Sequence, residues 1–489
     1  MEAGPLKWLQ KWKDRKRLKQ RQSTRQLMGI RKILPHGVAM PDGSLVFFLI
    51  RPDNLSVLSA EGIRQRVTAL SNLFRAEEQV EILGLDSRES FQQNEAYYQT
   101  RLEEETTPKI RELLQKDISY LDEIQTASAS SREFVLVLRM EEQAALDEGS
   151  LRQKEKALCD HGISVRLADA QDVKRLLVSY YLHDADPESL EDVDGERTVM
   201  MLRGYPPTTE EQALLRQLGE LEGVTVHLAV RKVSAAEEEA ILHAATNKSR
   251  MERSNISNVK QSITAEAKLQ DTASLILGMR RDREPLLHTS VFLELTARTM
   301  EELQRLRDSV SAILLRGKLS KDPLLLRQRD GYLSSNPAGR NTLGAFAEQV
   351  LPASSAANLF FLSYSGKTDP HGFFIGRDKY GSNVIVDLDR RAPDKTNGSS
   401  LILGNTGQGK SYLLKLLLCN VREDGKNVIA LDSEHELEDL CTSLDGCFLD
   451  LLSGQYRINL LEPRRWDDGS ELGDPDAPPA FRGTLLAQH

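Results

Sequence analysis

The feature that most constrains this chain is a Gly-rich stretch, "LILGNTGQGKSYLLKLLL", at residues 401–418. Gly404, Gly409, Lys410 and Ser411 fit the spacing GxxxxGK[ST]. Glycines let successive backbone N–H groups of such a loop face phosphate oxygens, while the Lys amino group binds the terminal phosphates and the hydroxyl binds Mg²⁺. The stretch therefore predicts a site for a nucleoside triphosphate, with a ligand-free Gly-rich turn as the alternative.

The predicted cofactors are ATP and Mg²⁺, with Ser411 as a Mg²⁺ ligand and Lys410 as a catalytic residue. The predicted nucleotide-binding residues are Gly404, Asn405, Thr406, Gly407, Gln408, Gly409, Lys410 and Ser411. The flanking segments have the pattern that this motif requires. An apolar run at 400–404 predicts a buried strand, an apolar helix is predicted from 410 up to Gly425, and "NVIALD" at 427–432 predicts the next strand.

The acidic residues after that second strand allow three interpretations. Asp432 can hold Mg²⁺ through water, with Glu434 activating the attacking water. The two can instead form an accessory acidic pair at the strand tip. In the third interpretation Ser433 caps a helix and Glu436 closes a capping box. We keep Glu434 as a predicted catalytic residue and Asp432 as a predicted metal ligand, with the structural alternative open.

The residues ahead of the loop alternate between strand and helix patterns. Apolar strand-like runs such as "LVFFLI" and "FVLVL" are separated by helical stripes, first over 45–185 and again over 197–315. Such alternation predicts α+β units of ferredoxin-like type, with helices covering a sheet. A segment rich in Ser, Pro, Gly and Asn follows at 320–372, and a hairpin is predicted next, with its turn at 380–382.

The predicted fold class is α/β, an α+β N-terminal region followed by the start of a P-loop NTPase domain. With 489 residues the chain is long enough for about three domains. The predicted ranges are a basic leader at 1–32, α/β subdomains at 33–185 and 186–345, and an incomplete P-loop NTPase domain at 346–489.

The leader differs in charge from the rest of the chain. Residues 1–32 carry eleven Lys or Arg against Glu2 and Asp14, although the whole chain has a net charge of −9. Trp8 and Trp12 share a face of any helix that forms there, which favours an anionic membrane surface or a partner. A solvated tail and nucleic-acid binding remain alternatives for the leader, and no specific nucleic-acid site is readable elsewhere.

The composition favours a cytoplasmic protein. The longest apolar runs are of strand length, far below the roughly 20 residues of a membrane span. The basic N-terminus lacks the apolar core of a secretory signal. The four cysteines form no CxxC pair, so we expect buried, reduced thiols.

Several segments together resemble a known family. "GFFIGRD", "VIVDLDRR", "NGSSLILGNTGQGKSYLLK", "VIALDSEHE" and "GCFLDLLSGQYRINLLEP" are similar to the ATPases of type IV secretion and conjugative-transfer machines, the CagE, TrbE and VirB family, and in particular to its Gram-positive mobile-element branch. The resemblance implies a RecA-like ATPase that works as a homo-oligomer. It also implies a peripheral location at the inner face of the cell membrane, with the subunits of the secretion or conjugation channel as partners.

The sequence departs from the family pattern at three places. Ser433 replaces the Pro of an acidic D-P-E-type motif that Asp432 and Glu434 otherwise match, and Leu460 replaces the Pro of an "INPL" motif. Family members also continue past the position of His489, through a Walker B strand and an arginine finger. We therefore expect a fragment or truncated product that binds nucleotide weakly and turns it over little or not at all.

The leading functional prediction is an ATP-binding component that powers conjugative DNA transfer or type IV secretion. One alternative is a non-catalytic scaffold that docks to a membrane channel. The other is a DNA-pumping coupling ATPase, which is disfavoured because such relatives usually begin with transmembrane helices.

Overall fold

The computed structural model describes residues 29–88, 91–128, 130–181, 196–206, 212–254, 281, 283–369, 371–377, 383–391, 397–454 and 456. The chain forms two compact units. Unit 1 comprises Met1–Tyr97 and Ser119–Gly398, and unit 2 comprises Tyr98–Ile118 and Ser399–His489. The leader residues 1–28 lie outside the described residues, and the domain ranges predicted from the sequence stay predictions.

The described residues of unit 1 form one eleven-stranded antiparallel sheet. Its strands follow the order β1-β2-β3-β5-β4-β8-β9-β7-β10, with β6 paired to β3 and β11 paired to β9. They are β1 (Lys32–Leu34), β2 (Gly37–Met40), β3 (Gly43–Ile50), β4 (Gln79–Arg88), β5 (Ser130–Met140), β6 (Val165–Leu167), β7 (Glu196–Gly204), β8 (Val224–Lys232), β9 (Leu286–Ala297), β10 (Ser320–Asp322) and β11 (Gln349–Pro352). The expected mixture of helices and strands is confirmed, and the pairing of β4 with β8 joins the two predicted subdomain ranges in one sheet.

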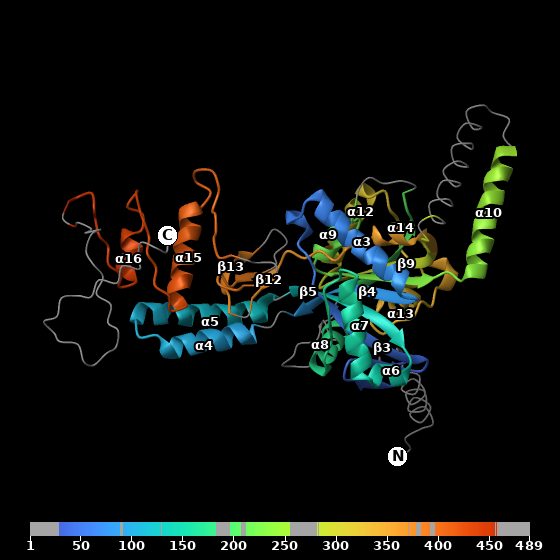
Figure 1. Ribbon diagram of the computed structural model, residues 1–489, viewed down its shortest axis with the longest axis horizontal. Helices are drawn as coiled ribbons and strands as arrows, with labels where there is room; N and C mark the ends of the chain where they lie inside the picture. Colours follow the sequence, from blue (N-terminus) through green and yellow to red (C-terminus); the bar gives the residue numbers. More distant parts are fainter. Residues whose placement is uncertain are drawn as a thin grey trace, which may run out of the picture. The chain divides into compact units, whose positions relative to one another are not determined.

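The apolar alternation of the strands divides unit 1 into two buried layers. On β3, Val46 and Phe48 enter one core, whereas Leu45 and Phe47 enter another on the opposite face. The first face is covered by α3 (Ala60–Ala76), α7 (Glu148–Asp160), α9 (Arg216–Glu220), α12 (Met300–Arg316) and α14 (Ala353–Ala357) (Figure 1). The second face packs against α8 (Ala170–Tyr181) and, near β7, against α13 (Gln328–Ser335).

Polar side chains fix where these helices begin. Ser59 Oγ accepts the N–H of Gly62 at the start of α3, at 3.2 Å. Thr299 Oγ1 accepts the N–H of Glu302 at the start of α12, also at 3.2 Å. Each bond satisfies one of the N–H groups that a helix leaves open at its first turn. These helices were expected from the sequence and are confirmed.

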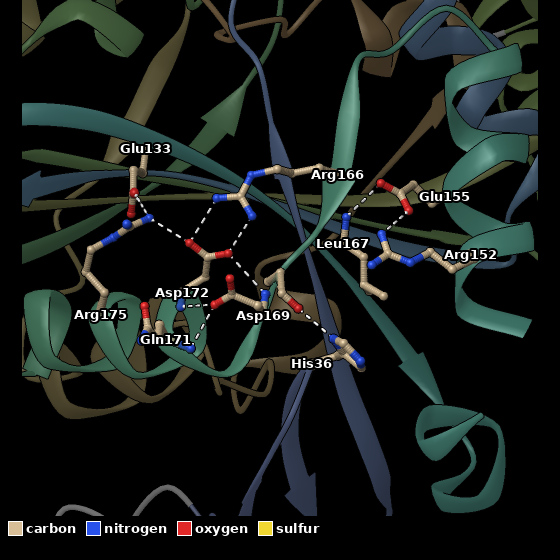
Figure 2. A network of polar contacts seen from close by, with 11 residues as sticks. His36, Glu133, Arg152, Glu155, Arg166, Leu167, Asp169, Gln171, Asp172 and Arg175 are labelled. Atoms are coloured by element: carbon tan, nitrogen blue, oxygen red, sulfur yellow. Dashed lines mark hydrogen bonds and ion pairs between the residues drawn. The ribbon is translucent and has the colours of Figure 1, made fainter. Parts of the chain in front are cut away.

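The start of α8 carries a dense polar network (Figure 2). Asp169 Oδ1 accepts the N–H of Asp172 at 2.8 Å, and Asp172 Oδ2 accepts the N–H of Asp169 at 3.0 Å, which is a reciprocal capping box. Arg166 on β6 binds both oxygens of Asp172, and Arg175 adds a bond of 3.1 Å. Although burial opposes ionisation, these partners lower the pKa of Asp172. The network therefore fixes α8 against β6.

A second, three-stranded sheet lies in unit 1. It has the order β12 (Lys367–Thr368), β14 (Asn383–Val386), β13 (Phe373–Arg377). β13 and β14 are antiparallel, so the predicted hairpin is confirmed, while its predicted turn at 380–382 lies outside the described residues. Asn94 Nδ2 donates to the carbonyl of Asp369 at 2.8 Å.

Unit 2 brings together segments that are far apart in the sequence. It contains the second part of α4 (Gln92–Glu104), the first part of α5 (Pro108–Ser128), and both α15 (Lys410–Glu423) and α16 (Glu438–Ser443). None of the helices in the described part of the chain combines the length and apolar composition that a membrane span requires.

The predicted strands on either side of α15 are not formed. The described residues at 400–404 and 427–432 have no strand pairing, and most of their large apolar side chains face solvent: Leu401 is 82% exposed and Leu431 is 98% exposed. An extended segment becomes a strand only when a neighbour takes up its backbone hydrogen bonds. Both segments are apolar, as strands require, but the described part of unit 2 offers them no partner strand. The predicted helix between them is confirmed as α15.

Candidate nucleotide-binding site

The Gly-rich loop leads directly into α15. Gly409 is the residue before the helix and has φ +82°, and Gly407 has φ +79°. Both angles lie in the left-handed region, which glycine adopts without the steric cost that a side chain brings. Two of the motif's inner glycines are therefore required by the backbone path of the loop, independently of any ligand.

The side chain of Lys410 folds back over this loop. Its Nζ donates to the backbone carbonyl of Asn405 at 3.0 Å, and the N–H of Gln408 donates to the same carbonyl at 3.3 Å. The ammonium group is thus held beside the loop backbone, where a bound phosphate would meet it. Residues 404–409 are all exposed, so the loop is accessible.

The first turn of α15 is suited to an anion. The first helical bond runs from the N–H of Leu413 to the carbonyl of Gly409 at 2.9 Å, which leaves the preceding N–H groups open to a ligand. This first turn contains no acidic residue that would offset the positive end of the helix dipole. Helix N-terminus, loop glycines and Lys410 fit the phosphates of a nucleotide, and the exposed Ser411 fits a hydroxyl ligand of Mg²⁺.

The acidic residues after 431 form a turn. Asp432 Oδ2 accepts the N–H of Leu437 at 2.7 Å, and Oδ1 accepts the N–H of Glu434 at 3.1 Å. These backbone donors, that of Leu437 first, lower the pKa of Asp432. Both of its oxygens are thus used in local structure, while the side chain of Glu434 is exposed.

The predicted capping residues of the next helix are corrected. Helix α16 begins at Glu438, after Leu437, so Ser433 and Glu436 do not form the expected capping box. Asp432 holds the turn instead, because His435 adopts φ +57° and turns the backbone away from a helix. The capping interpretation is therefore wrong: Leu437, the residue before α16, makes no side-chain cap bond, and Asp432 closes a turn ahead of the helix.

In the described part of the chain, no cluster of three or more His, Cys, Asp or Glu side chains suits a metal ion. All four cysteines are free thiols, but the expectation that they are buried is wrong. Cys159 and Cys447 are exposed, and Cys419 and Cys441 are half-buried. Cys159 lies near the end of α7 and Cys447 in a loop, while Cys419 and Cys441 lie within α15 and α16.

Sequence reasoning missed the contact at the far end of α15. Arg101 on α4 donates from Nε to the backbone carbonyl of Glu423 at 3.1 Å, and the carboxyl of Glu423 lies against that of Asp117 on α5. The only signal in the sequence is a pair of charged residues, Arg422 and Glu423, at the end of a largely apolar helix, in "LLLCNVRE". Such a residue is normally solvent-exposed, yet Glu423 is 2% exposed.

Comparison with known proteins identifies no family for this chain. No protein-family model matches the chain, and no curated protein matches it.

Proposed function

We propose that this protein binds a nucleoside triphosphate at residues 404–411 and that it is the ATP-binding component of a conjugative-transfer or type IV secretion machine. The observation that carries the first part is the joining of a positive-φ glycine loop to α15 at Lys410, with the Lys410 ammonium held beside the loop backbone. A loop of this kind at a helix N-terminus binds phosphate through backbone N–H groups and one ammonium.

In this proposal different groups of the loop and of α15 bind the phosphates and Mg²⁺. Backbone N–H groups of the loop and the first turn of α15 hold phosphate oxygens, and Lys410 supplies the positive charge. Ser411 would hold Mg²⁺, which neutralises phosphate charge when it is bound. Lys410 also orients the terminal phosphate, which is the contribution to phosphoryl transfer that this chain's own residues supply.

The proposed machine follows from the sequence resemblance. In this proposal the α/β region contacts the channel subunits and contains ferredoxin-like units. Residues 346–489 belong to an incomplete RecA-like domain, and the protein acts as an oligomer at the inner face of the cell membrane. The resemblance in the segments around the P-loop supports this part.

A second candidate function is nucleotide binding without turnover, as in a channel-docking scaffold. The observation that favours it is the position of Asp432, whose two oxygens accept backbone N–H groups at 2.7 and 3.1 Å. A carboxylate occupied in this way is a turn cap, and Glu434 beside it is exposed to water. Neither the backbone-bonded carboxylate of Asp432 nor the exposed carboxylate of Glu434 is positioned as a general base for an attacking water molecule.

Titration of the protein with a fluorescent ATP analogue and Mg²⁺ tests the proposed site. Lys410→Ala is expected to weaken binding by about ten- to a hundredfold, because a charge-assisted hydrogen bond contributes about 1.5–3 kcal/mol. Lys415→Ala is the matched control, because Lys415 lies on the same helix beyond its first turn. The control is expected to bind as the wild type does.

Equal affinity in Lys410→Ala and the wild type, or no binding by either, would reject the nucleotide site. Phosphate release measured on the same samples separates the two candidate functions. Turnover that is abolished by Lys410→Ala favours the ATPase, and binding without turnover favours the scaffold.

A further inference from the structure

The end of α15 opposite the nucleotide loop rests on the hairpin formed by α4 and α5 within unit 2. Figure 1 shows α15, in orange, ending beside these two helices. Glu423 is the last residue of α15, and the helix spans 14 residues, so this contact lies about 20 Å from the loop along the helix axis. A contact at one end of a rigid helix can set the position of the other.

The backbone of α15 is held by an arginine at this end. Arg101 donates to the carbonyl of Glu423 and forms ion pairs with Glu104 at 2.5 Å and Glu105 at 3.8 Å. Its guanidinium thus caps the negative end of the helix dipole and is already shared between two carboxylates of its own hairpin. It does not neutralise the side chain of Glu423.

That side chain is buried against a second acid. The carboxyl groups of Glu423 and Asp117 are within hydrogen-bonding reach of each other. Glu423 Oε2 is buried and meets no N–H or O–H donor among the described residues. An ionised carboxylate only accepts hydrogen bonds, so a bond between two carboxyls requires a proton on one of them.

The surroundings favour keeping that proton. Burial, together with the negative charge of Asp117, raises the pKa of Glu423 to about 8. Burial raises the pKa of Asp117 to about 6, against the opposing effect of its hydrogen bond to Glu423. Two neighbouring groups also titrate differently from free side chains. Burial, and then the negative charges of Glu423 and Asp117, raise the pKa of the Cys419 thiol. The pKa of the Glu105 carboxyl is lowered, first by hydrogen bonds from Thr107 and then by the positive charge of Arg422. The pair therefore holds one proton at neutral pH.

We propose that the α4–α5 hairpin positions the P-loop helix through a proton shared by Asp117 and Glu423, so that loss of this proton loosens α15 and weakens phosphate binding at its other end. The first part of this proposal, the structural half, is that the shared proton positions α15, and it needs only the contact itself. The second half, that loss of the proton weakens phosphate binding, rests on the proposed function. With the proton present, the protonated carboxyl donates a hydrogen bond to the ionised one. Without it, the negative charges of the buried Glu423 and the half-buried Asp117 repel each other, and water or a helix shift must separate them.

Hydrogen exchange of the full chain tests the structural half without nucleotide. Protection of the α15 amides, corrected for intrinsic exchange rates, is expected to fall about tenfold between pH 6.5 and pH 9, which corresponds to one pKa unit. Glu423→Gln keeps the shape and supplies an N–H donor without a charge, so its protection is expected to stay level over this range. Asp117→Asn is the second variant, in case the first one folds poorly. Glu112→Gln is the matched control, because Glu112 lies exposed on α5 and should titrate as the wild type does.

Affinity for the fluorescent ATP analogue with Mg²⁺, measured on the same samples, tests the second half. From pH 6.5 to pH 9 the affinity of the wild type is expected to fall several-fold more than the affinity of Glu423→Gln. Comparison with this variant corrects for the titration of the ligand itself, because both proteins meet the same ligand. Level protection in the wild type, or equal titration in Glu423→Gln, would overturn the shared proton. If the exchange protection of α15 in the wild type falls with pH while the affinity for the ATP analogue stays constant, the coupling between the two ends of the helix would be overturned. A wild type that binds no nucleotide at pH 6.5 would overturn the proposed function and, with it, the coupling, while the exchange data would still decide the shared proton.

Discussion

Arg101 and Glu423 are 322 residues apart in the sequence and meet at 3.1 Å, where Arg101 Nε donates to the carbonyl that ends α15. The side chain of Arg101 is only 14% exposed, so this bond forms largely out of water. It attaches the helix that begins at Lys410 to a hairpin encoded far earlier in the chain.

Replacement of Arg101 by Met is expected to loosen the last turn of α15. Met keeps most of the apolar stem but leaves the carbonyl of Glu423 without its donor, which costs about 1 kcal/mol. Exchange of the amides at 418–423 should therefore rise about fivefold, as measured by hydrogen-exchange mass spectrometry. Lys109→Met on the exposed side of α5 should leave these amides unchanged. If Arg101→Met also leaves them unchanged, Arg101 is not a cap.

Gly425→Ala is expected to destabilise the same helix end for two separable reasons. Gly425 has φ +78°, where an L side chain costs roughly 1–2 kcal/mol, and a Cβ there would lie 2.3 Å from Nη2 of Arg101. In the double variant with Arg101→Met the clash disappears and the backbone strain remains. The two substitutions should therefore combine non-additively in exchange measurements.

Gly149→Ala serves as the control for this cycle. Gly149 lies in the first turn of α7 without a positive φ, and a Cβ there would approach nothing closer than 3.4 Å. Its replacement should be neutral or slightly stabilising. An additive cycle would show that Arg101 does not crowd the position of Gly425.

The stability of unit 2 is expected to fall as the pH rises. The folded pKa values of Asp117 and Glu423 lie above their ordinary values of 3.8 and 4.5, so the folded state binds more protons between about pH 4 and pH 8. Their stabilising contribution is complete below this window and is lost as the pH rises through it. Urea-dependent exchange of α15 at a series of pH values should show the decline in the wild type, and Glu423→Gln should flatten it. A flat wild-type profile would contradict the raised pKa values.

The sequence predicted most of unit 1 because its strands carry their own signal. β3 alternates between two apolar cores, and both the helix α3 and the antiparallel hairpin of β13 and β14 follow from local patterns. In each of these elements the residues that decide the structure are neighbours in the chain. The start of α15 at Lys410 was predictable for the same reason, since the glycine spacing determines it.

The remainder of the site could not be predicted because it depends on distant partners. The apolar runs that contain Leu403 and Ile429 read as strands, yet strand formation requires a neighbour that no local pattern supplies, and these two side chains are 80% and 97% exposed. The contact of Asp117 with Glu423 joins residues about three hundred positions apart and has no periodic signature. The sequence allows three interpretations of Asp432, because only the turn at His435 shows which backbone N–H groups reach its carboxylate.

Asp432→Ala is expected to loosen the turn at 433–437 without weakening nucleotide binding. The variant loses the acceptor of the N–H groups of Glu434 and Leu437, so exchange of those amides should rise. Asp432→Asn keeps one acceptor oxygen and should lie between the variant and the wild type. Because backbone bonds lower the folded pKa of Asp432, its contribution is present above pH 4 and is lost as the pH falls below this value.

The affinity for Mg²⁺ and the ATP analogue is the measurement that separates a turn cap from a metal ligand. A cap leaves the affinity of Asp432→Ala within twofold of the wild type. A loss as large as that of Lys410→Ala would instead assign Asp432 to the metal, as the first interpretation of the sequence has it.

Asp86→Asn is expected to destabilise unit 1 more than any exposed charge substitution. Asp86 on β4 forms a buried ion pair with Arg132 on β5, in which the two side chains are 8% and 3% exposed, and its Oδ2 accepts the N–H of Gly223 at 2.7 Å. Removing the negative charge leaves a buried guanidinium uncompensated, which costs about 3–5 kcal/mol. A urea titration followed by far-UV circular dichroism measures the change. Glu61→Gln is the control, because its ion pair with Arg64 is exposed on α3 and should contribute less than about 1 kcal/mol. Equal midpoints for the two variants would show that the Asp86–Arg132 pair does not stabilise the sheet.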